Sequence, residues 1–263
     1  MYFLFLLFSL VSHYVSTAHA IPISSQCTNT EIRQSWFLGE CLTGQDSTTR
    51  IKSAVYLANK VANDDGDLKW KADGSYDSSC SECSLIEGGA TLNCSCKTAW
   101  GSKKGSRVAG TINLDEHISL YDGHLLSNLS GTPTPPSSLS NYPIPSSFSY
   151  SFGGTAHCFE PSDSNKTTTC PWNVPCSDTS NSGWMFDGPI TCYAPVIYFP
   201  IHHQFANLKI VGDGAWEVLA YDNEVCAGEP MGVVRPEDKG VCKGFERLAK
   251  AVTVRPAFNG DPQ

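Results

Sequence analysis

Apolar and polar residues alternate along two stretches of the first half of the chain, AVYLANKVAN at 54–63 and TINLDEHISL at 111–120. Such alternation is typical of a β-strand with one buried face, so each stretch predicts a strand. An Asp-Gly pair follows each stretch, at 65–66 and 122–123, and a leucine comes two residues after each glycine. Asp-Gly next to a strand favours a tight hairpin because glycine tolerates positive φ angles. We therefore predict one β-hairpin after each stretch.

The two stretches belong to a duplicated unit of about fifty residues, too few copies for a solenoid, which needs at least three. The matched pairs, at offsets of 53, 55 and 57, are Cys27 with Cys80, Cys41 with Cys96, and Asp65 with Asp122. Two copies predict one pseudo-symmetric β domain. The acid-rich first turn, 63–67, raises the alternative of a calcium loop, but it lacks the spaced oxygen ligands and distal glutamate of an EF-hand.

The first twenty residues carry a compact apolar run at 2–11 and close with the small-x-small pattern Ala18-His19-Ala20. This pattern is typical of a secretory signal peptide, which we predict at 1–20 although the segment has no Lys or Arg. The apolar run is too short to cross a bilayer. We expect a secreted, extracellular protein without membrane insertion.

Residues 131–150, GTPTPPSSLSNYPIPSSFSY, carry five prolines and six serines without helical or strand periodicity. Such composition indicates a semi-extended linker. Beyond it, alternating apolar residues and punctuating glycines at 215–234 and 240–259 predict further strands. The predicted division is a β domain at 21–130 with repeats at about 25–74 and 75–130, the linker at 131–150, and a C-terminal β-rich module at 151–263.

Charge and cysteine content narrow the functional classes. A formal charge of −8 and a pI near 5.3 argue against nucleic acid as a partner, because binding to phosphates needs a basic surface. Twelve cysteines behind a signal peptide favour disulfides over thiols. The spacing of Cys80, Cys83, Cys94 and Cys96 raises a zinc site as the alternative. Secretion and the even number of cysteines argue against it, so we expect neither metal nor cofactor. Glycosylation sequons stand at Asn93, Asn128 and Asn165.

The region from about Gln26 to Asn128 resembles the cyanovirin-N homology (CVNH) domain family. The similarity rests on the Cys27–Cys41 spacing, on DDGDLKW at 64–70, on Cys96-Lys97-Thr98 and on TINLDEHISLYDGHLL at 111–126. The resemblance implies an all-β fold of triple-stranded sheets and hairpins, in which strands are exchanged between the repeats. A second disulfide-braced β module would follow this domain. Members of the family bind mannose-rich glycans, so the resemblance also implies one sugar pocket at each Asp-Gly turn.

Polar residues surround the first turn in the pattern that the family uses to hold sugar hydroxyls. The carbohydrate-binding residues implied by the resemblance are Asn63, Asp65, Ser78, Ser79, Lys97 and Thr98. Asp65 would accept hydrogen bonds from sugar hydroxyls, Asn63 would donate and accept, and Thr98 would close the rim. Taken singly, Ser78, Ser79 and Thr98 are equally typical of plain strand-surface positions. Ala99 stands where the family often has a long polar side chain over the sugar, and Trp100 follows it.

The second pocket has fewer polar residues. Ser25, Gln26 and Asp122 remain as polar contributors, whereas Leu42, Gly44 and Leu120 stand where polar contacts would be expected. We predict a weak or inactive second site.

We predict disulfide bridges Cys27–Cys41, Cys80–Cys96 and Cys83–Cys94 in the first domain. The last two have position sums of 176 and 177, as nested bridges across one antiparallel hairpin require. In the C-terminal module the spacing predicts Cys226–Cys242, and the pairing of Cys158, Cys170, Cys176 and Cys192 stays open.

The second half contains residues that could serve catalysis, but nothing selects among them. Glycosidases need two carboxylates that flank the bond, and the candidates are Asp187, Glu217, Asp222 and Glu224. His202-His203 would point to opposite faces of a strand, which favours surface or packing roles over metal binding. Trp172, Trp184 and Trp216 are candidates for stacking on sugars or for the core.

The sequence therefore predicts a secreted lectin, without enzymatic activity, whose partners are mannose-rich oligosaccharides or glycoproteins. One alternative is a glycan-acting hydrolase with its catalytic residues in 151–263. The other is a structural cell-wall or host-interaction protein that has lost sugar binding.

Overall fold

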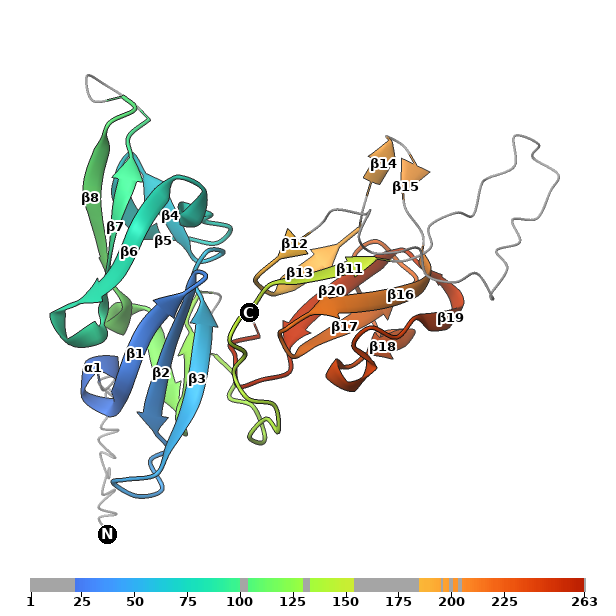
Figure 1. Cartoon of the computed structure of the whole chain (residues 1–263), viewed down its shortest axis with the longest axis horizontal. Helices are drawn as coiled ribbons and strands as arrows, with labels where there is room; N and C mark the ends of the chain where they lie inside the picture. Colours follow the sequence, from blue (N-terminus) through green and yellow to red (C-terminus); the bar gives the residue numbers. More distant parts are fainter. Residues whose placement is uncertain are drawn as a thin grey trace, which may run out of the picture.

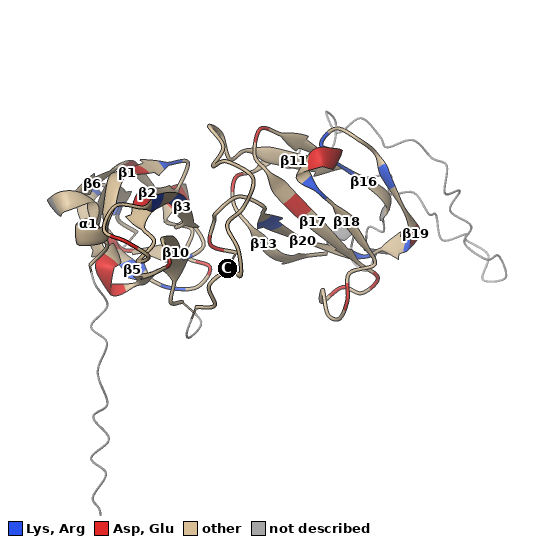
Figure 2. Ribbon diagram, turned by 90° about the horizontal axis from the view of Figure 1, so that it is seen from below, with Lys and Arg blue, Asp and Glu red and all other residues tan. Residues whose placement is uncertain are grey.

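The computed structural model describes residues 22–99, 104–129, 133–153, 185–194, 196–198, 201–202 and 205–262. It confirms the all-β fold, because one four-residue α-helix, α1 (Ile23–Gln26), stands among many strands in this part of the chain. Figure 1 shows two modules side by side, with the C-terminus between them. Acidic and basic residues are interspersed over both modules (Figure 2).

Each repeat of the first module folds into a three-stranded sheet followed by a hairpin, and all neighbouring strands are antiparallel. The strands of the first repeat are β1 (Cys27–Arg33), β2 (Trp36–Leu42), β3 (Arg50–Tyr56), β4 (Val61–Asp64) and β5 (Asp67–Trp70). Those of the second are β6 (Cys80–Ile86), β7 (Thr91–Lys97), β8 (Arg107–Asn113), β9 (Ile118–Tyr121) and β10 (His124–Ser127). Short 3-10 turns lie between them at η1 (Tyr76–Ser78), η2 (Glu87–Gly89) and η4 (Leu114–Glu116).

The long strand predicted at 54–63 is wrong in one respect, because a turn divides it, and the same holds at 111–120. In the first repeat the backbone N–H of Lys60 donates to the carbonyl of Leu57 at 2.9 Å. In the second, η4 occupies the same place, and the side chain of Asn113 caps it by accepting from the N–H of Asp115. Alternation continues across both breaks, so the pattern of apolar residues alone does not reveal them.

The hairpins are exchanged between the repeats. The first hairpin, β4–β5, packs against β8 of the second repeat, and the second, β9–β10, packs against β3 of the first. The approach is so close that a Cβ on Gly66 would lie 2.3 Å from Cγ2 of Val108. A Cβ on Gly123 would lie 2.5 Å from Cγ1 of Ile51. Both glycines are therefore required by packing as well as by the turn.

Disulfides brace both modules. Bridges join Cys27 to Cys41, Cys80 to Cys96 and Cys83 to Cys94, which confirms the three predicted pairs. The zinc alternative is wrong because these bridges consume all four of its ligands. The predicted bridge Cys226–Cys242 is also wrong: Cys226 is bonded to Cys192, and Cys242 is disulfide-bonded elsewhere. Cys192 lies on a strand far from Cys226 in sequence, so spacing alone could not pair them. Cys158, Cys170 and Cys176 lie outside the described residues.

The second module is a sandwich of two four-stranded sheets, ordered β12-β11-β16-β19 and β13-β20-β17-β18. Both sheets contribute to one apolar core, with Phe152 and Ile210 from the first sheet and Val218 and Val254 from the second. The bounds are β11 (Tyr150–Gly153), β12 (Met185–Phe186), β13 (Ile190–Tyr193), β14 (Val196–Tyr198), β15 (Ile201–His202), β16 (Phe205–Gly212), β17 (Trp216–Tyr221), β18 (Gly232–Val234), η6 (Pro236–Asp238), β19 (Lys243–Ala249) and β20 (Ala251–Pro256).

Strand β2 faces both modules, because its alternate residues enter different cores. Phe37 and Cys41 enter the core of the first module, whereas Trp36 and Leu38 enter that of the second. Trp36 is fully buried, stacks on Phe148 with ring centroids 4.7 Å apart, and donates from Nε1 to the carbonyl of Asp187 at 2.6 Å. The predicted linker, 131–150, therefore contains two core residues, Phe148 and Tyr150, and Phe148 packs on Trp36 of the first module.

The C-terminal tail returns to the first module. Ala54 of β3 donates to the carbonyl of Asn259 at 2.9 Å and accepts from the N–H of Asp261 at 2.8 Å. The buried carboxylate of Asp261 accepts from the backbone N–H of Ser127 at 3.0 Å and pairs with the buried ammonium of Lys60 at 3.8 Å. Burial lowers the pKa of Lys60 to about 8, although Asp261 opposes the change.

Candidate functional site

The two Asp-Gly pairs form two-residue hairpin turns of the same type. Asp64 pairs with Asp67 across the first turn, and Tyr121 pairs with His124 across the second. All four central residues have positive φ, at 54° and 103° for Asp65 and Gly66 and at 46° and 83° for Asp122 and Gly123. Positive φ at both central positions defines the type I′ turn, which matches the twist of the flanking strands. The repeated phrase is thus explained locally by turn geometry.

The side chain of Asn63 fixes the first turn to its surroundings. Its Oδ1 accepts from the backbone N–H of Gly66 at 2.7 Å. Its Nδ2 donates to Oγ of Ser79 and to the carbonyl of Lys97, both at 2.9 Å. Both hydrogens of the amide are therefore engaged within the protein. Asn63 acts as a positioning residue for the turn, which differs from the direct sugar contact that we expected.

Asp65 lies exposed at the tip of this turn, and the protein sets its orientation. Its Oδ1 accepts from the backbone N–H of Ala99 at 2.7 Å. The side chains of Ser78 and Lys97 are exposed and that of Ser79 is half-buried. Because Asn63 bonds to both Ser79 and Lys97, the first turn, the residues after η1 and the end of β7 meet at one place. Four of the six predicted residues, Asn63, Asp65, Ser79 and Lys97, are thus brought together, and Ser78 precedes Ser79 with its hydroxyl donated to the carbonyl of Ser75 at 2.7 Å.

Thr98 occupies a different place from the one predicted. It is only 7% exposed. Its Oγ1 donates to the carbonyl of Ser106 at 3.2 Å, and its backbone N–H donates to the same carbonyl at 2.9 Å. Thr98 therefore closes the base of the loop that begins after β7, rather than offering its hydroxyl at the rim.

Among the described residues, the second turn has no counterpart of the Asn63 amide, which joins the first turn to neighbouring segments. Leu120 stands at the position matching Asn63, is half-buried and packs against the core of the module. Asp122 and Ser25 are exposed, but Oγ of Ser25 donates to the carbonyl of Pro22 at 2.8 Å. Gln26 contributes its carbonyl to a guanidinium hydrogen of Arg50 at 2.5 Å. The hydroxyl of Ser25 is thus directed to a local backbone contact, whereas the bond of Gln26 to Arg50 uses its backbone carbonyl only.

Sequence reasoning missed one element of the second site, the loop at 43–49. The backbone N–H of Thr43 donates to the carbonyl of Thr49 at 3.0 Å, which repeats the closure made by Thr98 and Ser106. Hydrogen bonds from Thr49 and Thr48 hold the pKa of Asp46 below its usual range. The match of Cys41-Leu42-Thr43 with Cys96-Lys97-Thr98 was the signal that could have identified Thr43.

The described candidates of the second module have structural partners. Trp216 is buried and donates from Nε1 to the carbonyl of Phe148 at 3.1 Å, which assigns it to the core. Glu217 pairs with Arg255 at 2.6 Å and Asp222 with Arg247 at 2.5 Å. Burial raises the pKa of Asp187, which accepts from the hydroxyl of Tyr56 at 2.8 Å. Glu224 is exposed.

Other predicted residues lie partly or wholly beyond the described part of the chain. Trp100, Asn165, Trp172, Trp184, His203 and the signal peptide fall outside it, as does the side chain of His202. Of the described sequons, Asn128 is exposed and Asn93 is half-buried. Among the described residues no three His, Cys, Asp or Glu side chains cluster as a metal site would require. In the same residues, no helix is long and apolar enough to cross a membrane.

Comparison with known proteins was made at three levels. Residues 24–126 match the family model of the CVNH domain. A search of curated proteins found no match. Similar solved structures include the CVNH protein of T. borchii, with 23% identity, a TM-score of 0.35, and coverage of 41% of this chain and 99% of that one.

Two of the similar structures contain a sugar. A MoCVNH3 variant in complex with (N-GlcNAc)4 has 16% identity and a TM-score of 0.36, covering 40% of this chain and 95% of that one. Microvirin in complex with mannobiose has 22% identity and a TM-score of 0.33, covering 40% of this chain and 97% of that one.

Proposed function

We propose that the protein is a secreted lectin without enzymatic activity, because residues 24–126 match the family model of the CVNH domain. Its ligands are mannose-type glycans, free or on glycoproteins, and its working pocket lies at the first Asp-Gly turn. The observation that carries the proposal is the set of three hydrogen bonds by which Asn63 joins the turn to Ser79 and Lys97. A site organised before the ligand arrives loses less conformational entropy on binding.

Asp65 is the acceptor for sugar hydroxyls in this proposal. Asp65 is exposed at the tip of the turn, and the N–H of Ala99 donates to its Oδ1 and so fixes its orientation. Lys97, which is exposed, adds a donor beside it, and the hydroxyl of Ser78, which donates to the carbonyl of Ser75 at 2.7 Å, offers its oxygen as a further acceptor. Each such hydrogen bond replaces one made to water, so its net contribution is about 0.5–1.5 kcal/mol. A single shallow site then has a Kd of about 0.01–1 mM.

Binding is asymmetric in this proposal, with one working pocket per chain. The second turn keeps Asp122 but has Leu120 in place of the organising amide. High avidity therefore requires oligomers or a further site, since linking multiplies affinity only where a second site exists. The ion pairs of Glu217 and Asp222 with arginines support a non-enzymatic second module, because a glycosidase needs two carboxylates that face substrate.

A glycan array with the mature full-length protein tests the class of ligand. Signal on mannose-terminated structures is expected, and a complete lack of signal on them would overturn the proposed specificity. Sequencing the N-terminus of the protein recovered from culture medium tests secretion. We expect the mature chain to begin at Ile21.

Calorimetric titration with mannobiose tests the pocket. Asp65→Ala removes an exposed acceptor without altering the core, and it should weaken binding at least tenfold. Asp122→Ala is the matched control at the second turn and should change the Kd less than twofold. If the control variant suffers the larger loss, the working pocket belongs to the other turn.

A further inference from the structure

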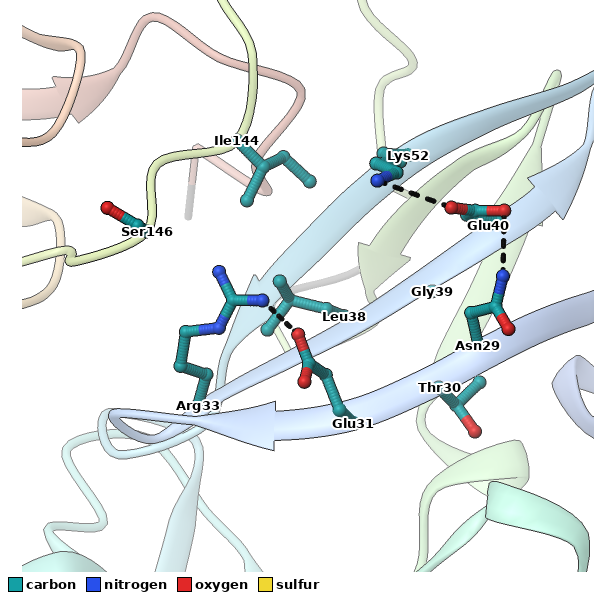
Figure 3. Close-up of a pocket in the computed structure, with 10 residues that line it drawn as sticks. All are labelled: Asn29, Thr30, Glu31, Arg33, Leu38, Gly39, Glu40, Lys52, Ile144 and Ser146. Carbon is teal, nitrogen blue, oxygen red and sulfur yellow. Dashed lines mark hydrogen bonds and ion pairs between the residues drawn. The ribbon is translucent and has the colours of Figure 1, made fainter.

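A concave surface lies on the opposite side of β1–β2–β3 from the core of the first module. It is a groove of about 610 Å³, lined by strand residues of the first module and by Ile144 and Ser146 of the segment between the modules. Figure 3 shows this segment across the groove from the strands, with the side chain of Ile144 directed toward them and the hydroxyl of Ser146 directed away. None of the residues predicted for either sugar pocket lines it. The volume falls within the range of small-molecule sites.

Strand geometry places charged side chains along the floor of the groove. Ile32 packs against the core of the first module, so its neighbours Glu31 and Arg33 point the other way. On β2, Leu38 and Glu40 share the outer face because Phe37 and Cys41 enter the core. A β-bulge between Thr28 and Glu31, with Asn29 at a φ of 52°, directs the amide of Asn29 toward Glu40.

The charges in the groove form two pairs of opposite sign. Glu31 pairs with Arg33, and Glu40 pairs with Lys52 at 3.3 Å. Glu40 also accepts from Nδ2 of Asn29 at 3.0 Å. Lys52 is 70% exposed and the other three charged side chains are about one third to one half exposed. Exposed ion pairs of this kind contribute little to stability, so a ligand can replace their partners at small cost.

The segment that carries Ile144 and Ser146 forms one wall of the groove. Hydrogen bonds hold this segment to β1 and to the turn that follows β1. Arg33 donates to the carbonyl of Pro145 at 2.9 Å. The side chain of Gln34 accepts from the N–H of Phe148 and donates to Oγ of Ser149, both at 2.8 Å. The groove therefore exists because the two modules are joined, and the first module alone would present an open sheet face.

We propose that this groove binds a neutral oligosaccharide, independently of the Asp-Gly turns. Its paired charges cancel, so a ligand with net charge gains no advantage. Carboxylates and an amide accept from and donate to vicinal hydroxyls, which are the groups that neutral sugars present. Leu38 and Ile144 supply an apolar surface for the C–H face of a sugar ring. Such a site would make the two-module chain bivalent for glycan.

Amide chemical shifts of the full-length mature protein locate the site during titration. The probes are mannobiose, an N-acetylglucosamine tetramer and, as an anionic control, trigalacturonate, each up to about 10 mM, above a weak Kd of about 1 mM. We expect saturable shifts at 29–33, 38–40, 144 and 146 with at least one neutral probe, and weaker binding of the anionic one. The groove shifts should persist in Asp65→Ala.

Variants in the groove complete the test. Glu31→Gln with Glu40→Gln should weaken binding at the groove at least fivefold, whereas Glu246→Gln, an exposed carboxylate on β19, should leave it unchanged. Unaltered thermal unfolding shows that the double variant is folded. Shifts confined to 63–66 and 97–99 would overturn this inference but leave the proposed function intact. Shifts confined to the groove would support this inference and overturn the pocket proposed at the first Asp-Gly turn. Tighter binding of trigalacturonate, or groove shifts that the double variant retains, would also overturn it.

Discussion

The two repeats of the first module make the same hairpin turn but differ in what surrounds it. Asp65-Gly66 and Asp122-Gly123 share their backbone conformation. In the first repeat Asn63 joins the turn to two other segments, whereas in the second the matching Leu120 joins the core. The two copies thus share the turn, but only the first has an amide that joins it to neighbouring polar segments.

The repeats differ again at the bases of their hairpins. At an offset of 57, Lys60 matches His117 and Trp70 matches Ser127. Trp70 of the first repeat stacks on His117 of the second, with ring centroids 4.7 Å apart. In the symmetry-related place the small Ser127 leaves room for Asp261, which bonds to Ser127 and to Lys60. The C-terminal tail therefore fills a space that an aromatic ring fills on the other side.

The largest expected effect comes from removing the carboxylate of Asp261, which pairs with the buried ammonium of Lys60 in the first repeat. Asp261→Asn leaves the ammonium of Lys60 buried without its carboxylate and should lower the free energy of unfolding by about 3 kcal/mol. Chemical denaturation measures the loss. Asp213→Asn, at an exposed ion pair with Lys239, is the control and should cost less than about 0.5 kcal/mol. Equal losses in both variants would contradict a special role for the tail.

The next effect is a pH dependence that belongs to Lys60. Its pKa is lowered to about 8 by burial, so between pH 8 and the usual value of 10.5 the unfolded chain binds the proton more tightly. The free energy of unfolding should then rise with pH above 8, by at most about 1.4 kcal/mol per pH unit from this group. Denaturation at pH 7.5 and 9.5 tests it. The double variant Lys60→Met with Asp261→Asn should lose this slope.

A third experiment makes the first turn resemble the second. Asn63→Leu removes the amide that orders the pocket and should weaken mannobiose binding about tenfold, or about 1.4 kcal/mol. Leu120→Ala, at the matched position, should leave the Kd unchanged, although it removes packing from the core. Normal binding by Asn63→Leu would show that Asp65 needs no positioning residue.

The smallest effect concerns the histidines of the second repeat. Burial lowers the pKa of both His117 and His124 below the usual 6.5, so the unfolded chain takes up protons first on acidification. The free energy of unfolding should decrease as the pH falls below about 6.5, and this decrease should be smaller in His124→Gln. A stability profile that is flat between pH 7 and 5 would contradict this expectation.

Local patterns determined much of the first module. Alternating residues, Asp-Gly turns and paired cysteines predict the strands, both hairpins and three disulfides, because each depends on neighbours that are close in sequence or on one antiparallel pairing. These patterns did not show that Asp65, Ser79 and Lys97 are neighbours. That expectation came from the family resemblance. Spacing failed for Cys226, whose partner Cys192 is brought near by the pairing of non-adjacent strands.

Tertiary structure alone decided how the parts are joined. Trp36 and Phe37 are adjacent apolar residues in one strand, yet they enter different cores because the second module covers the outer face of β2. Lys60 resembles an ordinary surface lysine until the tail brings Asp261 to it across some two hundred residues. The sequence by itself determined the strand-forming stretches and the two Asp-Gly turns, which depend on local backbone preference, but not the turns that divide 54–63 and 111–120. The groove, the buried ion pair and the positioning role of Asn63 depend on contacts between distant segments, and only the packed chain determines those.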